Sequence, residues 1–187
     1  MQIVIGASGW QHDQWQGQFY PDDIPLEWRF SYYANEFDTL LLPFKMWSTC
    51  KFEEIESWLV DVPKDFDLFL EVGENPNSDI VKKLLSHELF AHHQVKFTSK
   101  LTMPVSVNCE MQQGIIIDHK FSGEEVVVLR CFSEDVIKLD EIRQIIEKAH
   151  DDYSKCDRLY LFFDQALLDI GVLNNAKIIV DLLIAVE

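Results

Sequence analysis

Short apolar runs alternate along this chain with segments in which apolar residues recur at helical spacing, and this alternation restricts the fold more than any other feature. The strand-like runs lie at residues 3–5, 39–42, 66–72 and 159–163. Helical spacing is found at residues 26–37, 52–59, 80–85, 137–153 and about 170–186. Each strand-like run is apolar on both faces, which is typical of a parallel sheet covered by helices. The sequence therefore predicts an α/β fold.

The pattern changes between residues 92 and 132. Short strand-like runs lie there at residues 95–98, 105–109, 114–118 and 125–132. The segments between these runs are too short for the ten or more residues of a typical crossover helix. We therefore expect residues 92–123 to contain no helix longer than about two turns.

The chain has 187 residues, and 48% of them are hydrophobic. This number of apolar residues suffices for one substantial core, but the chain is too short for two domains of ordinary size. No linker or internal repeat divides it, so residues 1–187 are expected to form a single domain. No basic leader precedes the first apolar run, and no stretch approaches the roughly 18 to 20 apolar residues of a membrane helix. The expected location is the cytoplasm.

The formal net charge of −16 bears on the partners. A field of this sign repels phosphate backbones and anionic membrane surfaces, so neither a nucleic acid nor a membrane is expected as a partner. A local basic pocket that holds one small anion remains compatible with this charge. The four cysteines, Cys50, Cys109, Cys131 and Cys156, are widely spaced, and we expect them to be reduced thiols, mostly buried.

Aromatic residues and glycines with a distinctive spacing follow the first strand-like run. The segment IGASGWQHDQWQGQFYPDDIP contains Gly9-Trp10, Trp15, Gly17 and Phe19-Tyr20-Pro21. The pattern continues through Trp28, Tyr32-Tyr33-Ala34 and Phe37-Asp38-Thr39, and near the C-terminus through residues 126–130, 159–163 and Asn175-Ala176. This combination resembles the YecE-like family, also called domain of unknown function 72.

The resemblance implies a TIM-like barrel of eight parallel strands. Members of the family are usually longer than this chain, and the deficit falls in the irregular stretch, so outer helices between about His92 and Gly123 are expected to be lost. The prediction is a shortened or incomplete TIM-like (β/α) barrel with mostly parallel strands. Closing such a barrel places residues 3–5 beside both 39–42 and 159–163.

The departures from the family pattern fall at the ends of strands, where barrel active sites are built. Glu71 stands where the family commonly has Lys, Phe132 where a His is expected, and Asp164-Gln165 where paired Asn residues occur. Ser8, Trp10 and Arg130 keep the family character, and they are the ligand-binding candidates. Trp10 and Trp15 either line a pocket or plug the barrel.

Arg130 lies within an otherwise apolar run, where a guanidinium is costly unless an anion pairs with it. One interpretation is a clamp for a small anionic ligand. The other, which we favour, is an internal ion pair with Glu71, Asp118 or Asp164. We expect Arg130 to be largely buried and paired with Asp164 or Glu71.

Three carboxylates follow apolar runs at expected strand ends, namely Glu71, Asp118 and Asp164. Together with Arg130 they are the catalytic candidates, because converging carboxylates supply an acid and a base or bind a divalent cation. Ordinary loop carboxylates have the same pattern. No motif for a cofactor is present, and His87, His92 and His93 lack the spacing of zinc ligands, so neither a cofactor nor a metal is expected.

The sequence leaves the function open between different classes. The favoured hypothesis is a degenerate barrel that acts as a non-catalytic binding or structural protein. The alternative is a small acid–base or metal-assisted hydrolase with the carboxylate cluster and Arg130 as its anion clamp. A homodimer formed through surfaces left uncovered by missing helices is a third hypothesis.

Overall fold

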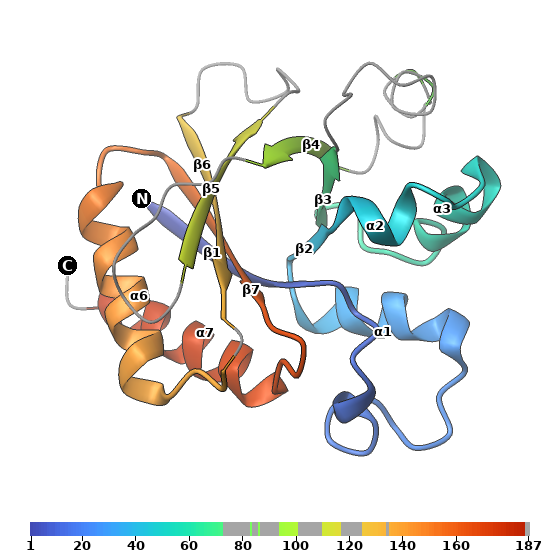
Figure 1. The fold of residues 1–187 in the computed structure, drawn as a ribbon, viewed down its shortest axis with the longest axis horizontal. Helices are drawn as coiled ribbons and strands as arrows, with labels where there is room; N and C mark the ends of the chain where they lie inside the picture. The colour runs from blue at the N-terminus through green and yellow to red at the C-terminus, as the bar shows by residue number, and fades with distance from the viewer. Residues whose placement is uncertain are drawn as a thin grey trace.

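The computed structural model describes residues 1–72, 83, 86, 94–100, 110–116, 125–133 and 135–185. Seven strands form a closed barrel in the order in which they occur in the chain (Figure 1). The strands are β1 (Gln2–Ser8), β2 (Thr39–Leu42), β3 (Asp67–Val72), β4 (Gln94–Lys100), β5 (Glu110–Ile116), β6 (Val126–Phe132) and β7 (Arg158–Asp164). The predicted shortened TIM-like barrel is confirmed.

Helices lie outside the strands, with α6 and α7 together on one side and α1, α2 and α3 on the other (Figure 1). Their bounds are α1 (Arg29–Glu36), α2 (Phe44–Trp47), α3 (Phe52–Trp58), α6 (Leu139–Asp152) and α7 (Ile170–Ile184). Two 3₁₀ turns, at Asp13–Trp15 and Leu26–Trp28, precede α1. None of the helices in the described part of the chain is both long enough and apolar enough to span a membrane.

Local sequence explains where the two C-terminal helices begin. The Glu141 side chain accepts a hydrogen bond from the Lys138 N–H at 2.8 Å, and Asp169 accepts one from the Gly171 N–H at 2.7 Å. Both bonds satisfy backbone donors that have no partner within the first turn of a helix. The apolar stripe of α6 is buried, and it consists of Ile142, Ile145, Ile146 and Ala149.

The strand pairing confirms the predicted neighbours of the first strand. β1 pairs in parallel with β2, where Ala7 lies opposite Leu40, and with β7, where Ile3 lies opposite Leu159. The pairs β2–β3, β3–β4 and β6–β7 are parallel as well. The barrel is therefore mostly parallel, as expected.

The direction of β5 was not anticipated. This strand runs antiparallel to both β4 and β6. A parallel strand needs a crossover of a dozen or more residues, whereas only residues 101–109 lie between β4 and β5. The short connection thus reverses the chain, and the ring closes with seven strands.

Part of the predicted irregular stretch can be compared with the structure. Within residues 92–123, the described segments 94–100 and 110–116 are strands, in agreement with the expected lack of long helices there. The predicted strand at residues 105–109 and the predicted helix at residues 80–85 lie outside the described residues, apart from Lys83.

Side chains alternate between an inner and an outer core along β1, β2, β3, β6 and β7. The inner core consists of Val4, Leu41, Phe69, Val128, Tyr160 and Phe162, which fill the barrel. Their neighbours in sequence, such as Ile5, Leu70 and Leu161, belong to the outer core beneath the helices. The interior is therefore packed with side chains, as in a complete TIM barrel.

A tyrosine hydroxyl joins β1 and β2 near the point where their direct pairing begins. The Ala7 N–H donates to the Tyr33 hydroxyl at 2.9 Å, and this hydroxyl donates to the Thr39 carbonyl at 3.0 Å. A Cβ atom at Gly6 would lie 2.7 Å from the Thr39 carbonyl oxygen, so only glycine fits beside that strand. Tyr33 has no exposed surface, and burial raises the pKa of its hydroxyl.

We predict that Tyr33→Phe lowers the free energy of unfolding by about 1 to 3 kcal/mol, because it leaves two buried backbone groups without their partner. Urea unfolding of the two proteins measures the difference. Tyr32→Phe is the matched control. It removes the same hydroxyl group from the neighbouring position on α1, where the side chain is only half-buried. An equal effect of the two substitutions would refute the bridging role of the Tyr33 hydroxyl.

Candidate functional site

Four polar side chains lie at the carboxyl ends of strands that run in the same direction. Ser8, Glu71, Arg130 and Asp164 end β1, β3, β6 and β7 or lie close to their ends. Each follows an inner-core residue by an even number of positions, as Glu71 follows Phe69 and Asp164 follows Phe162. Because successive side chains of a strand alternate between faces, all four occupy the inner face at one mouth of the barrel.

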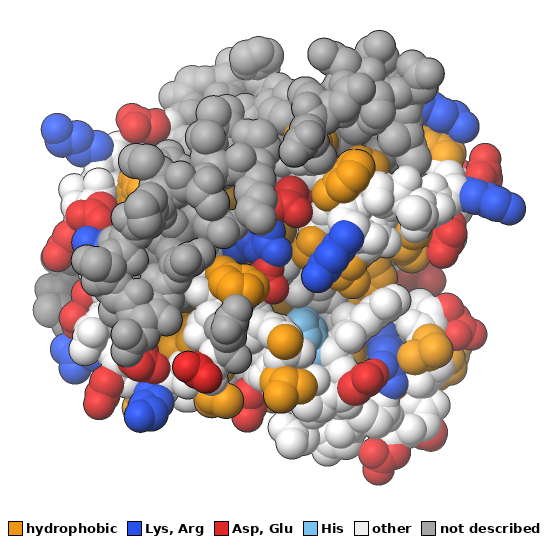
Figure 2. All heavy atoms as spheres, viewed as in Figure 1, with side chains coloured by type: hydrophobic (Ala, Val, Ile, Leu, Met, Phe, Trp, Pro, Cys, Tyr) orange, Lys and Arg blue, Asp and Glu red, His pale blue; other side chains and the backbone are white. Residues whose placement is uncertain are grey.

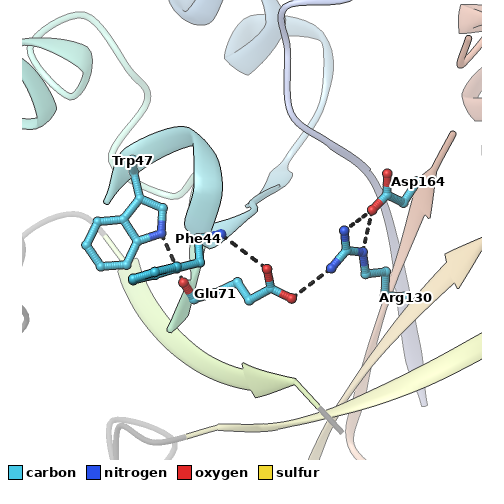
Figure 3. A network of polar contacts seen from close by, with 5 residues as sticks. All are labelled: Phe44, Trp47, Glu71, Arg130 and Asp164. Carbon is cyan, nitrogen blue, oxygen red and sulfur yellow. Dashed lines mark hydrogen bonds and ion pairs between the residues drawn. The ribbon is translucent and has the colours of Figure 1, made fainter. Parts of the chain in front are cut away.

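Arg130 is held between two carboxylates at this mouth (Figure 3). Its Nη1 lies 2.7 Å from Glu71 Oε1, and its Nε and Nη2 both contact Asp164 Oδ2. The Arg130, Glu71 and Asp164 side chains are 14%, 13% and 16% exposed. The predicted pairing of a largely buried Arg130 is confirmed, with both of the expected partners.

Glu71 also fastens the short helix α2 to the barrel. Its Oε2 accepts a hydrogen bond from the Phe44 N–H at 3.1 Å, and its carbonyl accepts one from Trp47 Nε1 at 3.0 Å (Figure 3). Both oxygens of the Glu71 carboxylate are therefore occupied. The segment after β2 is thus tied to the same network as Arg130.

The charges of this network do not cancel. Two carboxylates surround one guanidinium, which leaves a formal charge of −1 at the mouth. Each of the three guanidinium nitrogens already donates to, or contacts, a carboxylate. In Figure 2, acidic and basic side chains and a histidine lie together near the middle of the face shown.

Ser8 differs from the other three because its hydroxyl is not paired. The residue is 5% exposed, and its Oγ has no hydrogen-bond partner among the described residues. Ala7 lies opposite Phe163 in the pairing of β1 with β7, and Ser8 and Asp164 are the next residues of the two strands. Neighbouring strands of a sheet lie about 4.7 to 4.9 Å apart, so the two side chains project from adjacent positions.

His12 is a residue of this site that the sequence did not reveal. Its Nε2 lies 3.2 Å from the Ser8 carbonyl oxygen, and its ring packs 4.4 Å from the Trp15 ring, measured between centroids. Burial lowers the pKa of His12, while the Ser8 carbonyl and the negative charge of Asp164 act in the opposite direction. Its place four residues after the last strand residue was the only signal available in the sequence.

Trp10 is placed away from the polar network. Its ring is 3% exposed and belongs to the outer core, where it packs 4.8 Å from the Phe30 ring and 5.1 Å from the Trp58 ring, measured between centroids. Trp15 is fully buried and donates from Nε1 to the Leu168 carbonyl. Both tryptophans thus pack in the outer core between the strands and the helices near α1.

Asp118, His87, His92 and His93 lie outside the described residues. β5, the strand before Asp118, runs in the opposite direction, so its carboxyl end at Ile116 is not at the mouth that holds Arg130. Among the residues that the structure describes, no group of three or more His, Cys, Asp or Glu side chains could hold a metal ion.

The prediction of reduced thiols is wrong for Cys131, which is disulfide-bonded. Its partner lies outside the described residues. A pair of single, widely spaced cysteines has no motif that indicates a bond, because the bond depends on which strands become neighbours. Cys50 and Cys156 are free, and burial raises the pKa of both thiols.

A second polar network lies at the opposite end of the barrel interior. The Tyr160 hydroxyl donates to Asp67 Oδ2 and accepts a hydrogen bond from Arg158 Nη1 at 3.1 Å. Arg158 Nη1 lies 3.8 Å from the same carboxylate oxygen. Alternation along β3 and β7 places these residues on the inner face, two positions before Phe69 and Phe162 respectively for Asp67 and Tyr160.

We predict that the fall in the free energy of unfolding between pH 8 and pH 5 is smaller for His12→Gln than for the unchanged protein. Because the pKa of His12 is lower in the folded state than its ordinary value of 6.5, the unfolded chain binds the proton more readily. Stability is then lost as pH falls below about 6.5, and the glutamine variant lacks this contribution. Urea unfolding at several pH values measures it, and parallel pH profiles would contradict the prediction.

Residues 4–75 match the family model described as protein of unknown function DUF72. A crystal structure of a DUF72 family protein from Thermotoga maritima superposes with a TM-score of 0.60 at 12% sequence identity, covering 98% of this chain and 99% of that one. A second DUF72 family protein, from Enterococcus faecalis, gives a TM-score of 0.36 at 10% identity, covering 96% of each chain. The first likeness supports the barrel fold. No curated protein matches the chain.

Proposed function

We propose that this chain, whose residues 4–75 match the model of the DUF72 family of proteins of unknown function, is a non-catalytic binding or structural protein. In this proposal an internal ion-pair network occupies Arg130 at the barrel mouth, and no reaction takes place there. The observation that carries the proposal is the pairing of Arg130 with both Glu71 and Asp164.

The geometry of Arg130 argues against an anion clamp. A clamp for a carboxylate or phosphate needs guanidinium N–H groups that point to open solvent, usually two in parallel. Here each of the three guanidinium nitrogens of Arg130 already contacts Glu71 or Asp164. A ligand anion would have to displace a carboxylate that is already in place and largely buried.

The residue exchanges at the strand ends support the same conclusion. The resemblance to the family places Glu71 where a Lys is common, and Asp164 where an Asn is expected. Both exchanges add a negative charge within reach of Arg130, and both new carboxylates contact it. An open basic site in the relatives would thereby become an internal network in this chain.

The alternative hydrolase receives less support from the geometry. An acid–base pair needs a proton acceptor that faces the substrate. Glu71 has both oxygens occupied, by Arg130 and by the Phe44 N–H. Asp164 keeps one oxygen without a partner among the described contacts, but Glu71, the other carboxylate that contacts Arg130, has no oxygen left to act as its acid or base partner.

We predict that Arg130→Met lowers the free energy of unfolding by about 3 kcal/mol, because it leaves two carboxylates together in a largely buried place. The combined change Glu71→Gln, Arg130→Met and Asp164→Asn should recover most of that loss, since no uncompensated charge remains. Urea unfolding of the single and the triple variant measures both values.

Arg143→Met is the matched control for this experiment. Arg143 forms an ion pair with Glu147 on α6, but its side chain is 68% exposed, so solvent screens the pair and the substitution should lower the free energy of unfolding far less than Arg130→Met does. If Arg130→Met is as mild as the control, Arg130 is not part of a structural network and the proposal fails.

Inorganic phosphate provides an independent test of the anion clamp. We expect millimolar phosphate to shift the thermal midpoint of the unchanged protein no more than sodium chloride of equal ionic strength does. A phosphate-specific rise that is lost in Arg130→Met would show that Arg130 binds anions. That result would replace the structural role with the anion-binding one.

The homodimer and the cytoplasmic location stay predictions. On α7, Ile178 and Leu182 lie one turn apart and are 55% and 63% exposed, so apolar surface is present on the outside of this helix. Sedimentation velocity at several protein concentrations measures whether the chain associates.

A further inference from the structure

We propose that the mouth of the barrel between β1 and β7 binds a small ligand with a primary ammonium group, held by Ser8, His12 and Asp164. The inference goes beyond the proposed function and depends on it in one respect, namely that Arg130 stays with its two carboxylates. Under that condition the polar atoms of the mouth that have no hydrogen-bond partner among the described residues lie on the Ser8 side of the network.

The first observation is the buried hydroxyl of Ser8. The residue is 5% exposed, and its Oγ has no partner among the described residues. A buried polar group without a hydrogen bond costs about 1 to 3 kcal/mol, so such groups are rare in folded proteins. Val4 lies in the inner core on the same strand, so alternation directs the Ser8 side chain into the barrel mouth.

The second observation is the unequal use of the two Asp164 oxygens. Both contacts from Arg130 go to Oδ2, and Oδ1 receives none of the described hydrogen bonds or ion pairs (Figure 3). The β1–β7 register pairs Ala7 with Phe163, and Ser8 and Asp164 are the next residues of the two strands. A carboxylate oxygen and a hydroxyl at adjacent positions of neighbouring strands can accept hydrogen bonds from the same donor group.

The third observation is the orientation of the His12 ring. The Ser8 carbonyl can only accept, so the contact at 3.2 Å requires that His12 Nε2 carries the proton. In the neutral ring, Nδ1 then remains as an acceptor. Burial keeps the pKa of His12 below its ordinary value, while the Ser8 and Gly9 carbonyls and the negative charges of Asp164 and Asp13 act in the opposite direction.

These atoms define the chemistry of the ligand. A carboxylate oxygen and an imidazole nitrogen both accept hydrogen bonds, and a hydroxyl adds a third acceptor, whereas –NH₃⁺ supplies three donors. The two carboxylates and one guanidinium leave a charge of −1, which a single positive charge neutralises. The net charge of −16 on the chain also attracts cations toward this mouth.

The experiment titrates the folded protein with methylammonium chloride and follows the His12 ring and the Ser8 and Asp164 amides by NMR. Tetramethylammonium chloride is the matched probe, because it has the same charge and no N–H donor. We expect saturable shifts at these residues with methylammonium and only weak, unsaturable ones with tetramethylammonium. Equal shifts with the two salts would overturn the proposal, since charge alone would then explain them.

Two variants locate the site. Ser8→Ala removes an unpaired hydroxyl, so it should fold as well as the unchanged protein and bind methylammonium about tenfold more weakly. Ser57→Ala is the control, because the Ser57 hydroxyl is exposed on α3 and donates to the Glu54 carbonyl. Unchanged affinity in Ser8→Ala would overturn the proposal. This outcome is distinct from a failure of the proposed function, which the phosphate titration detects.

Discussion

The arrangement of the barrel mouth depends on one guanidinium held between two carboxylates. Arg130 lies above an inner layer that includes Phe69 and Phe162, where an unpaired positive charge would be costly. Its partners Glu71 and Asp164 come from strands 59 and 34 residues away in the sequence. Because the contacts require all three strand ends at fixed positions, the ion-pair network sets the positions of β3, β6 and β7, and through Glu71 also the position of α2.

The reversed strand explains how a short chain keeps this arrangement. β5 closes the ring between β4 and β6, and the antiparallel pairing is confined to that side of the barrel. β1, β6 and β7 remain adjacent and parallel, with their carboxyl ends at one mouth. The parts of the barrel that hold Ser8, Arg130 and Asp164 are therefore those with the regular topology, and the irregular part lies across the ring from β1.

The sequence predicted the parallel strands and the partners of Arg130 because both follow from local patterns. An apolar run marks a buried strand, and a charged residue at its end has few places to find a counter-charge. The direction of β5 was missed because an apolar run has the same pattern in either direction. Tyr33 and His12 were missed for another reason: their contacts depend on how the loop after β1 folds back, and no spacing in the sequence records this.

The two ends of the barrel interior contain the same kinds of groups, arranged with different results. At the end opposite the mouth a carboxylate, a guanidinium and a hydroxyl meet, and the Tyr160 hydroxyl both donates to Asp67 and accepts from Arg158. At the mouth a carboxylate and a guanidinium meet again, but the Ser8 hydroxyl at the end of β1 is left without a partner in the described part of the chain. A serine side chain is too short to reach across the interior as tyrosine does, so the acceptors beside it remain open to a group from outside the chain. The hydroxyl at the end opposite the mouth thus has its hydrogen bonds within the chain. The mouth is the end at which a bound molecule would lower the free energy of the folded state.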